Sequence, residues 1–594
     1  METLQCTCIQ ALAKCIEESK FRGYSKLIDD LPSGEKLKYQ VNPELSNRIF
    51  EILTKAPLIF SADTAHEISK VFNVTRVTLT SPIVNNAARD LLRSFNLVEL
   101  RLLDLQKEDT EGGLKCTPDY EYGFGIIAAL KSMFSSESLK SLRVLKIDGN
   151  LTGFRCDYID QIAEVLGPVL QHLDINFCRF PPDPFKTVFN RFPILTELDA
   201  SYTSISSLQG ISQLKNLEKL SLAGLAIGDD ECQELFKLRK LQFLNLANFD
   251  NDSGRGFVKY SFKVESALPE LKVLDISKWE CNLTTGQLTS LVEIYPKLET
   301  IGLINYQNPP IAIPGVKLLV NTTIEQCLES LDYYLNNWGF QHDTITKIIM
   351  TIHLESERTS EELMIQCLGK IIEAIDHGAK FMSIYDAPFE AFSSLINEYR
   401  LQKITPSQRH SLARYLLAQR PRNDWIRLYF RLFQQCFTND AFLASPYINY
   451  SMVCNKTIDF VQRGVTKEGY RQAALDMGVE ILSRCLCKMS TSDETFREKK
   501  FDRLFDYLMS GYNRNSRHAA VAVFVHAFSF STNQSMTEDQ KVQLMTEIMH
   551  CIHGYGRNCS NDIRDVHRFI QAHCESTGVK DWIDWLMIKM CGDT

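Results

Sequence analysis

One phrase occurs eight times between Leu97 and Tyr306: leucine, any two residues, leucine, any one residue, then leucine or isoleucine in most copies. It is clearest in LEKLSLAGLAI, which starts at Leu217. The alternation in its centre predicts a short strand, and the outer leucines would fill the interior of a coil. Because one such unit cannot bury its apolar face alone, the copies must stack. The chain is therefore expected to form an α/β leucine-rich-repeat solenoid.

The other copies start at regular positions, and a weaker forerunner starts at Val74; the starts are Leu97, Leu142, Leu170, Leu195, Leu241, Leu271 and Leu298. Most starts are roughly 22 to 30 residues apart, which leaves room for a helical or irregular return path. The longer interval after Leu97 contains a polar stretch and then GFGIIAALKSMF, which predicts an inserted loop and helix. We expect the solenoid to span residues 51–308.

The apolar period becomes helical after Pro309 and Pro310, and we expect a junction at residues 309–321. The following segments place apolar residues on one helix face: Ile324, Cys327, Leu328, Leu331 and Leu335 in one, and Leu363, Cys367, Leu368, Ile371 and Ile375 in the next, which stops at Gly378. Further helical segments follow, with few strand signals. Residues 322–594 are therefore expected to form an all-α armadillo- or HEAT-like helical solenoid.

Composition limits the classes of partner and compartment. The 65 Lys and Arg residues against 73 Asp and Glu residues give a formal charge of −8, so we expect no nucleic-acid partner. The 18 cysteines are scattered as in proteins with reduced thiols, and no run of about 18 apolar residues predicts a membrane span. We therefore expect an unanchored protein of the cytoplasm, and also of the nucleus.

The first twenty residues predict an amphipathic helix. Leu4, Cys8, Leu12 and Ile16 stand four apart and form one apolar stripe, and Thr3 is placed to cap the helix. Two interpretations fit this pattern equally well. The helix either covers the open end of the solenoid or docks on another protein.

The segment from Thr3 to Leu12 resembles the BC box of elongin-binding proteins, in which an apolar leucine precedes a cysteine by four positions. The resemblance implies that Leu4 enters a pocket on elongin C and that the small Cys8 lets the helix lie close, with Thr3, Leu12 and Ile16 in the same contact. The box is followed by leucine-rich repeats and a helical domain. This order resembles the Zyg-eleven/Zer-one family of substrate receptors for cullin-two RING ubiquitin ligases.

Receptors of this family carry a cullin box after the BC box, and Leu31, Pro32 and Leu37 are similar to it. Glu35 departs from the apolar residue expected within that box, which leaves the identity of the cullin open. An ordinary helix stop and turn is the alternative for Leu31 and Pro32. We expect residues 1–50 to form a helical region that contains both boxes.

In this family the helical domain binds substrate N-termini, often ones that begin with glycine. This chain lacks the Trp-Asn-Leu-Thr-Asp-type run that we associate with the binding pocket. Residues 423–425 (NDW) and 581–585 (DWIDW) have similar residue types in another order, and the start of an ordinary helix is the favoured interpretation of each. No substrate-binding positions are assigned.

Chemical motifs are sparse. Nucleotide-binding, hydrolase and metalloprotease signatures do not occur, and a His and Cys concentration from His550 to Cys574 lacks the paired spacing of zinc sites. We expect no metal, no cofactor and no catalytic residue. The resulting hypothesis is a non-catalytic receptor that binds elongin B–elongin C, cullin-two and protein substrates. The alternative is a protein-interaction scaffold built from two solenoids, independent of any ligase.

Overall fold

The computed structural model describes residues 41–53, 62–79, 86–102, 126–147, 158–176 and most of 188–465, together with isolated positions between 477 and 485 and residues 581 and 584. The chain divides into two compact units, Met1–Thr322 and Thr323–Thr594. The BC-box and cullin-box residues Thr3, Leu4, Cys8, Leu12, Ile16, Leu31, Pro32 and Leu37 lie outside the described residues, so these assignments stay predictions.

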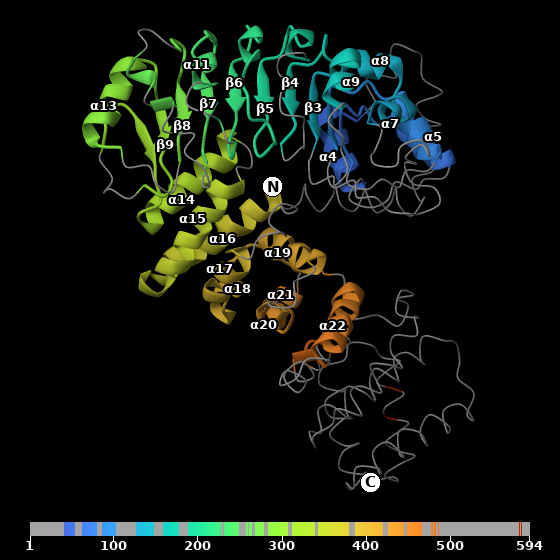
Figure 1. The fold of residues 1–594 in the computed structure, drawn as a ribbon. Helices are drawn as coiled ribbons and strands as arrows, with labels where there is room; N and C mark the ends of the chain where they lie inside the picture. The colour runs from blue at the N-terminus through green and yellow to red at the C-terminus, as the bar shows by residue number, and fades with distance from the viewer. Residues whose placement is uncertain are drawn as a thin grey trace. The chain divides into compact units, whose positions relative to one another are not determined.

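The first unit is built on one parallel sheet of ten strands in chain order (Figure 1). The strands are β1 Arg76–Leu79, β2 Glu99–Leu102, β3 Val144–Ile147, β4 His172–Asp174, β5 Glu197–Asp199, β6 Lys219–Ser221, β7 Phe243–Asn245, β8 Val273–Asp275, β9 Thr300–Gly302 and β10 Lys317–Leu319. Strands β2 to β9 each begin two residues after the first leucine of a repeat phrase, and β1 does so after Val74. The leucine-rich-repeat prediction is confirmed.

Return segments between the strands are helical in most repeats. They are α6 Asn86–Ser94, α7 Ile126–Met133, α8 Ser136–Ser141, α9 Tyr158–Val165, η1 Phe189–Arg191, η2 Ile211–Gln213, α11 Cys232–Leu235 and α13 Thr285–Ile294, while α4 Pro43–Leu53 and α5 Ala62–Val71 precede β1. Helix α7 is the inserted helix expected after Leu97. Buried side chains from Ile49 to Val320 form one apolar core between strands and helices, as the stacking argument requires.

Two boundaries differ from the sequence expectation. Strand β10 lies inside residues 309–321, which were expected to be a junction, and it pairs with β9. The Lys317 amide donates to the Glu299 carbonyl at 2.8 Å, so the free edge of β9 recruits a strand that lacks the repeat phrase. Helix α4 also crosses residue 50, the expected end of the N-terminal helical region.

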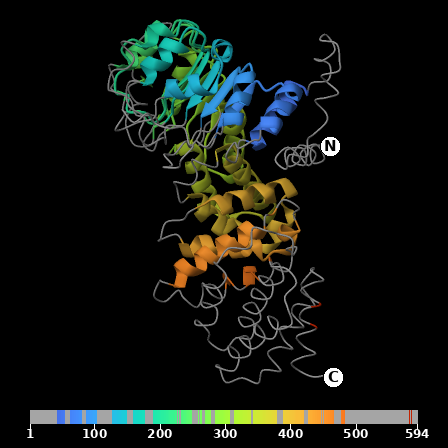
Figure 2. The same cartoon turned by 90° about the vertical axis from the view of Figure 1, so that its right-hand side faces the viewer.

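The second unit is helical throughout its described part. Its elements are α14 Ile324–Tyr333, the π-helical turn η4 Tyr334–Trp338, α15 His342–Glu355, η5 Ser356–Arg358, α16 Glu361–Gly378, α17 Ala387–Leu395, α18 Glu398–Lys403, α19 Pro406–Ala418, α20 Ile426–Phe437, α21 Asp440–Leu443 and α22 Tyr450–Val465. Figure 2 shows these helices, coloured yellow to orange, as successive layers. A leucine-rich-repeat unit followed by a helical solenoid is thus the fold of the chain.

Candidate functional site

Helix α4 covers the first edge of the sheet. Its buried residues Ile49 and Phe50 join the core, and the Phe50 ring meets the Phe95 ring edge to face at 5.4 Å between centroids. Ser46 Oγ accepts a hydrogen bond from the Asn73 amide at 3.1 Å and donates to the Val41 carbonyl at 3.0 Å. The helix is therefore fixed to the chain just before β1 by apolar and polar contacts.

Asn47 supplies at β1 the acceptor that the preceding repeat supplies to each later strand. At the start of each strand from β2 to β9, two successive amides donate to one carbonyl of the previous repeat; Val98 and Glu99, for example, both donate to the Thr75 carbonyl. At β1 the corresponding amides, of Thr75 and Arg76, donate to Asn47 Oδ1 at 2.9 and 3.0 Å. Asn47 Nδ2 also donates to Thr75 Oγ1 at 3.0 Å. One amide side chain thus satisfies the two amides at the start of this edge of the sheet.

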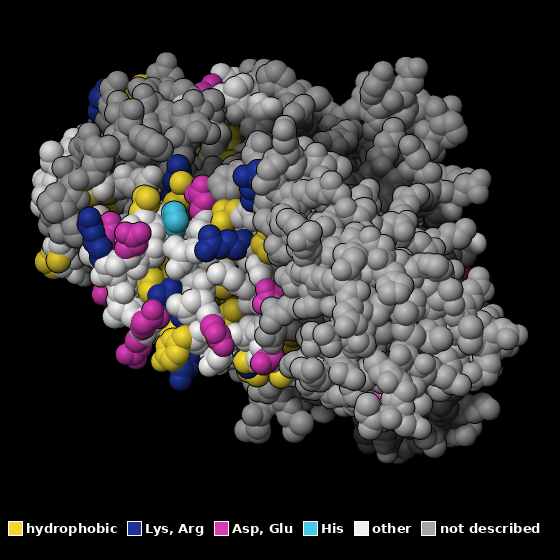
Figure 3. Space-filling view, turned by 90° about the horizontal axis from the view of Figure 1, so that it is seen from below, with side chains coloured by type: hydrophobic (Ala, Val, Ile, Leu, Met, Phe, Trp, Pro, Cys, Tyr) yellow, Lys and Arg dark blue, Asp and Glu magenta, His cyan; other side chains and the backbone are white. Residues whose placement is uncertain are grey.

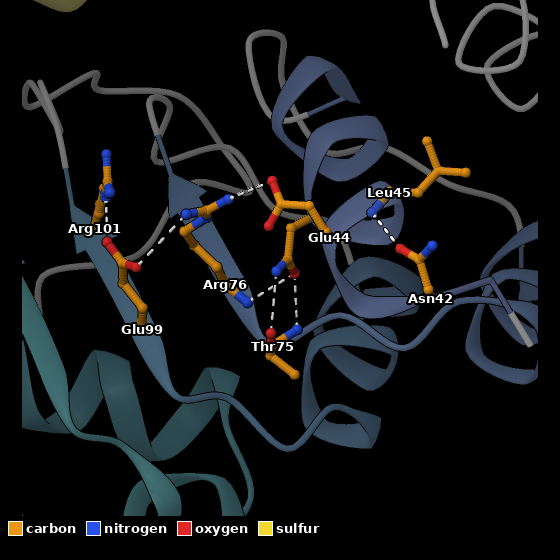
Figure 4. A network of polar contacts seen from close by, with 8 residues as sticks. Asn42, Glu44, Leu45, Thr75, Arg76, Glu99 and Arg101 are labelled. Carbon is orange, nitrogen blue, oxygen red and sulfur yellow. Dashed lines mark hydrogen bonds and ion pairs between the residues drawn. The ribbon is translucent and has the colours of Figure 1, made fainter. Parts of the chain in front are cut away.

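Charged side chains extend this cap across β1 and β2 (Figure 4). Arg76 lies between Glu44 of α4, at 3.5 Å, and Glu99 of β2, at 4.0 Å, and Arg101 pairs with Glu99 at 2.5 Å. At the start of α4, Asn42 Oδ1 accepts from the Leu45 amide at 2.9 Å and caps the helix. The contacts of Asn47 were not predicted from the sequence, since Asn47 and Thr75 are 28 residues apart.

The face of the sheet that points away from the core is polar over β4, β5 and β6; we call it the polar face. Leucines alternate with its residues and are buried in the core. Glu197 accepts from His172 Nδ1 at 3.1 Å and lies 2.8 Å from Lys219 Nζ. These partners lower the pKa of Glu197 to about 2, with the hydrogen bond from His172 as the largest cause. The carboxylate is therefore ionised throughout the physiological range.

Asp174 and Asp199 occupy neighbouring positions on the polar face, in register on β4 and β5. Each accepts from the amide two residues further on, Asn176 at 3.2 Å and Ser201 at 3.0 Å. Burial raises the pKa of both carboxyls, that of Asp174 to about 7, where the negative charge of Asp199 also contributes. Elsewhere on the described surface, Figure 3 shows Lys and Arg side chains beside Asp and Glu.

Thiol and metal chemistry have little support in the described part of the chain. Its cysteines are buried; they are Cys232, Cys327, Cys367, Cys436, Cys454 and Cys485. Burial raises the pKa of Cys327 and Cys367 to about 12, which keeps these thiols protonated and weakly nucleophilic. No described group of three or more His, Cys, Asp or Glu residues could hold a metal ion. The cluster from His550 to Cys574 lies outside the described residues.

None of the helices that the structure describes has the length and apolarity needed to cross a bilayer. Residues 423–425, expected to start a helix, lie outside the described residues, whereas Asp581 and Asp584 are described and helical.

Comparisons with known proteins give one curated relative and a distant fold match. No protein-family model matches the chain. Gastrulation-defective protein 3 of Caenorhabditis elegans is 26% identical over 304 residues, which are 50% of this chain and 41% of that protein. The match therefore spans less than half the length of this relative. An internalin crystal structure from Listeria monocytogenes matches 47% of this chain and 86% of its own, with 16% identity and a TM-score of 0.26. The similarity to the C. elegans protein is consistent with membership of the chain in the Zyg-eleven/Zer-one family.

Proposed function

We propose that this chain is a non-catalytic substrate receptor of a cullin-two RING ubiquitin ligase. In this proposal the helix that contains Thr3, Leu4, Cys8, Leu12 and Ile16 docks on elongin C of the elongin B–elongin C pair, and Leu31, Pro32 and Leu37 contact cullin-two. The helical solenoid binds the substrate, the leucine-rich repeats act as a spacer or a secondary binding surface, and catalysis belongs to other subunits. A receptor needs only to raise the effective concentration of a substrate lysine near the ubiquitin-carrying enzyme. We place the complex in the cytoplasm, with the nucleus as a second compartment.

The observation that carries the proposal is the cap formed by α4. The sequence left two functions open for the first helix, covering the solenoid or docking on a partner. Asn47 already satisfies the Thr75 and Arg76 amides, and Ile49 and Phe50 already cover the apolar end. The Leu4 stripe is therefore not required to cap the solenoid. This favours the interpretation that the first helix docks on another protein. The C. elegans relative supports the same family.

A pulldown with purified elongin B–elongin C tests this proposal. The variant combines Leu4→Ser with Cys8→Asp and should lose binding, because a polar side chain and a charge replace the apolar contact. A matched control is Met350→Ser with Leu354→Asp on α15, where both side chains are exposed, by 36% and 73%. The control makes the same kind of change four residues apart and should bind normally.

Hydrogen exchange of the same variants separates docking from capping. If the first helix docks, the Leu4/Cys8 variant should protect β1 as well as the native chain does. Faster exchange in β1 would instead indicate that the stripe helps to cover the sheet. Failure of a folded native chain to bind elongin B–elongin C would reject the receptor and leave the ligase-independent scaffold.

A further inference from the structure

The described helices of the second unit divide by charge along the chain. Residues 323–378, which contain α14, α15 and α16, hold ten Asp and Glu residues against three Lys and Arg residues. Residues 400–437, which contain α19 and α20, hold eight Lys and Arg residues against one Asp. The formal charge of −8 for the whole chain conceals this opposition. Acidic helices and basic helices therefore occur in one unit.

Helix α14 carries its acidic residues on one exposed side, which we call the acidic stripe. Glu325 and Glu329 are one helical turn apart and exposed, and Asp332 follows at the next turn of the same side. Buried residues occupy the opposite side: Ile324, Cys327, Ser330 and Leu331. Asp332 pairs with Lys370 of α16 at 2.5 Å, whereas Glu325 has no Lys or Arg within ion-pair distance among the described residues. The acidic stripe therefore keeps negative charge on the surface of the unit.

Helix α20 carries only basic charges, on a side that we call the basic stripe. Arg427 and Arg431 are one turn apart and exposed. Buried residues occupy the opposite side: Ile426, Tyr429, Phe430, Phe433 and Phe437. Arg427 lies in the first turn, where the helix dipole disfavours a cation and favours an anion. An anionic partner would relieve this unfavourable position as well as the repulsion between the two arginines.

The two stripes match in spacing but belong to different layers of the unit. In each helix the charged pair is four positions apart, about 6 Å along the axis. Helix α14 contacts α15 and α16, whereas α20 contacts α17, α21 and α22 (Figure 1). If α20 of one copy lies along α14 of another, Arg427 and Arg431 can both face a glutamate at the same time. The planar guanidinium suits such pairing because it binds a carboxylate through two parallel hydrogen bonds.

We propose that the basic stripe of one copy binds the acidic stripe of a second copy, so that the protein associates with itself head to tail. Each copy in such a contact still has one stripe available, so association continues beyond two copies or closes into a ring. A second copy is favoured over nucleic acid because the acidic helices of the same unit would repel a long polyanion. This inference is independent of the ligase proposal.

Sedimentation velocity of the full chain tests the proposal. The native chain should associate more strongly with rising protein concentration, and raising the salt from about 0.05 M to about 0.5 M should dissociate it. One variant combines Arg427→Glu with Arg431→Glu, and the other combines Glu325→Lys with Glu329→Lys. Each should weaken association by at least about tenfold, because like charges then face each other. An equimolar mixture of the two variants should associate again, because each acidic stripe then meets a basic one.

A matched control changes the same number of charges in the repeat unit. Lys237 and Lys240 are exposed there, and a variant that combines Lys237→Glu with Lys240→Glu should associate as the native chain does. Unchanged unfolding midpoints would show that the variants are folded, since all the substituted side chains are exposed.

Three outcomes would overturn the proposal. They are a native chain that stays monomeric at low salt, association that survives in both double variants, and a mixture of the folded variants that does not associate. If the native chain is monomeric and requires Arg427 and Arg431 to bind a polyglutamate peptide or a DNA oligonucleotide, the basic stripe instead serves a foreign acidic partner.

Discussion

The repeat unit and the helical unit satisfy their backbones in different ways. In the repeat unit, each strand donates amides to the repeat before it, so the hydrogen bonds run between repeats and the first edge needs a substitute acceptor. In a helix the amides bond within the same element, and neighbouring helices meet mainly through side chains. Loss of the acceptor at the first edge should therefore destabilise the repeat unit. The helical unit should instead be destabilised most by changes to its most densely packed side chains.

Two features concentrate the packing of the helical unit. An aromatic cluster joins α20 and α22, where Phe433 contacts Tyr429, Phe437 and Phe460 with ring centroids 4.4 to 5.9 Å apart. The second feature is Arg400, whose guanidinium donates to two backbone carbonyls. Neither depends on a backbone ladder, so damage to either should stay within the helical unit.

Phe433→Ala should have the largest effect. Phe433 is fully buried, and its truncation should cost about 4 kcal/mol through lost burial and the cavity that remains. Hydrogen exchange should accelerate in α20 and α22 and stay unchanged in β4 to β8. Leu220→Ala in the repeat core is the counterpart and should reverse that pattern. Equal loss of protection in both units after either change would contradict the comparison.

Arg400→Leu should have the next largest effect. Arg400 is 9% exposed, and its guanidinium donates to the Ser394 and Leu395 carbonyls at 3.1 and 3.0 Å, as well as to both Glu361 oxygens. Leaving the two carbonyls without their donor should cost about 2 kcal/mol, measured by denaturant unfolding followed in the helical unit. Glu361→Gln serves as the comparison and should change stability much less, because the Glu361 side chain is 56% exposed.

Asn47→Ala tests the sensitive edge of the repeat unit. Removal of Oδ1 leaves the Thr75 and Arg76 amides without their acceptor and should cost about 1.5 kcal/mol. Exchange should accelerate in β1 and α4 before it does so in β7 or β8. Asn47→Asp keeps an acceptor and should retain most of the protection. If β1 exchanged normally in the alanine variant, Asn47 would not be the acceptor that stabilises this edge.

Glu197→Gln should have the smallest effect, confined to acidic pH. The lowered pKa of Glu197 means that its ionised form stabilises the fold above its ordinary value of 4.5, and that this contribution is lost as the pH falls toward about 2. With 31% of the side chain exposed, solvent should limit the contribution to below about 1 kcal/mol. Unfolding midpoints at about pH 5 and about pH 3 should differ less in the variant than in the native chain. An equal difference would show that other carboxyl groups dominate.

Sequence reasoning located the repeat strands but not the features at their edges. The phrase at Leu170 or Leu217 predicts a strand because its leucines must be buried in the solenoid core, whatever path the rest of the repeat takes. Strand β10 was not predicted, because Lys317–Leu319 lacks the repeat phrase and is a strand only through its pairing with β9. Several helices, among them α19, were also not predicted, although Thr405, Pro406 and Gln408 form a capping signal that could have indicated its start.

The candidate functional residues were likewise only partly predicted from the sequence. The BC-box and cullin-box residues were proposed from the sequence and stay predictions. The polar face was not proposed, although the spacing of the repeats places Asp174 and Asp199 at equivalent positions. What the sequence could not supply is the burial of that pair and the commitment of His172 and Lys219 to Glu197.

The sequence by itself determined the class of fold, because periodic apolar residues leave few ways to bury their surface. Only the tertiary structure decided which group closes the first edge of the sheet and which charges pair on the polar face. Those outcomes depend on contacts between residues far apart in the chain, such as Asn47 with Thr75, and local patterns do not encode such distances.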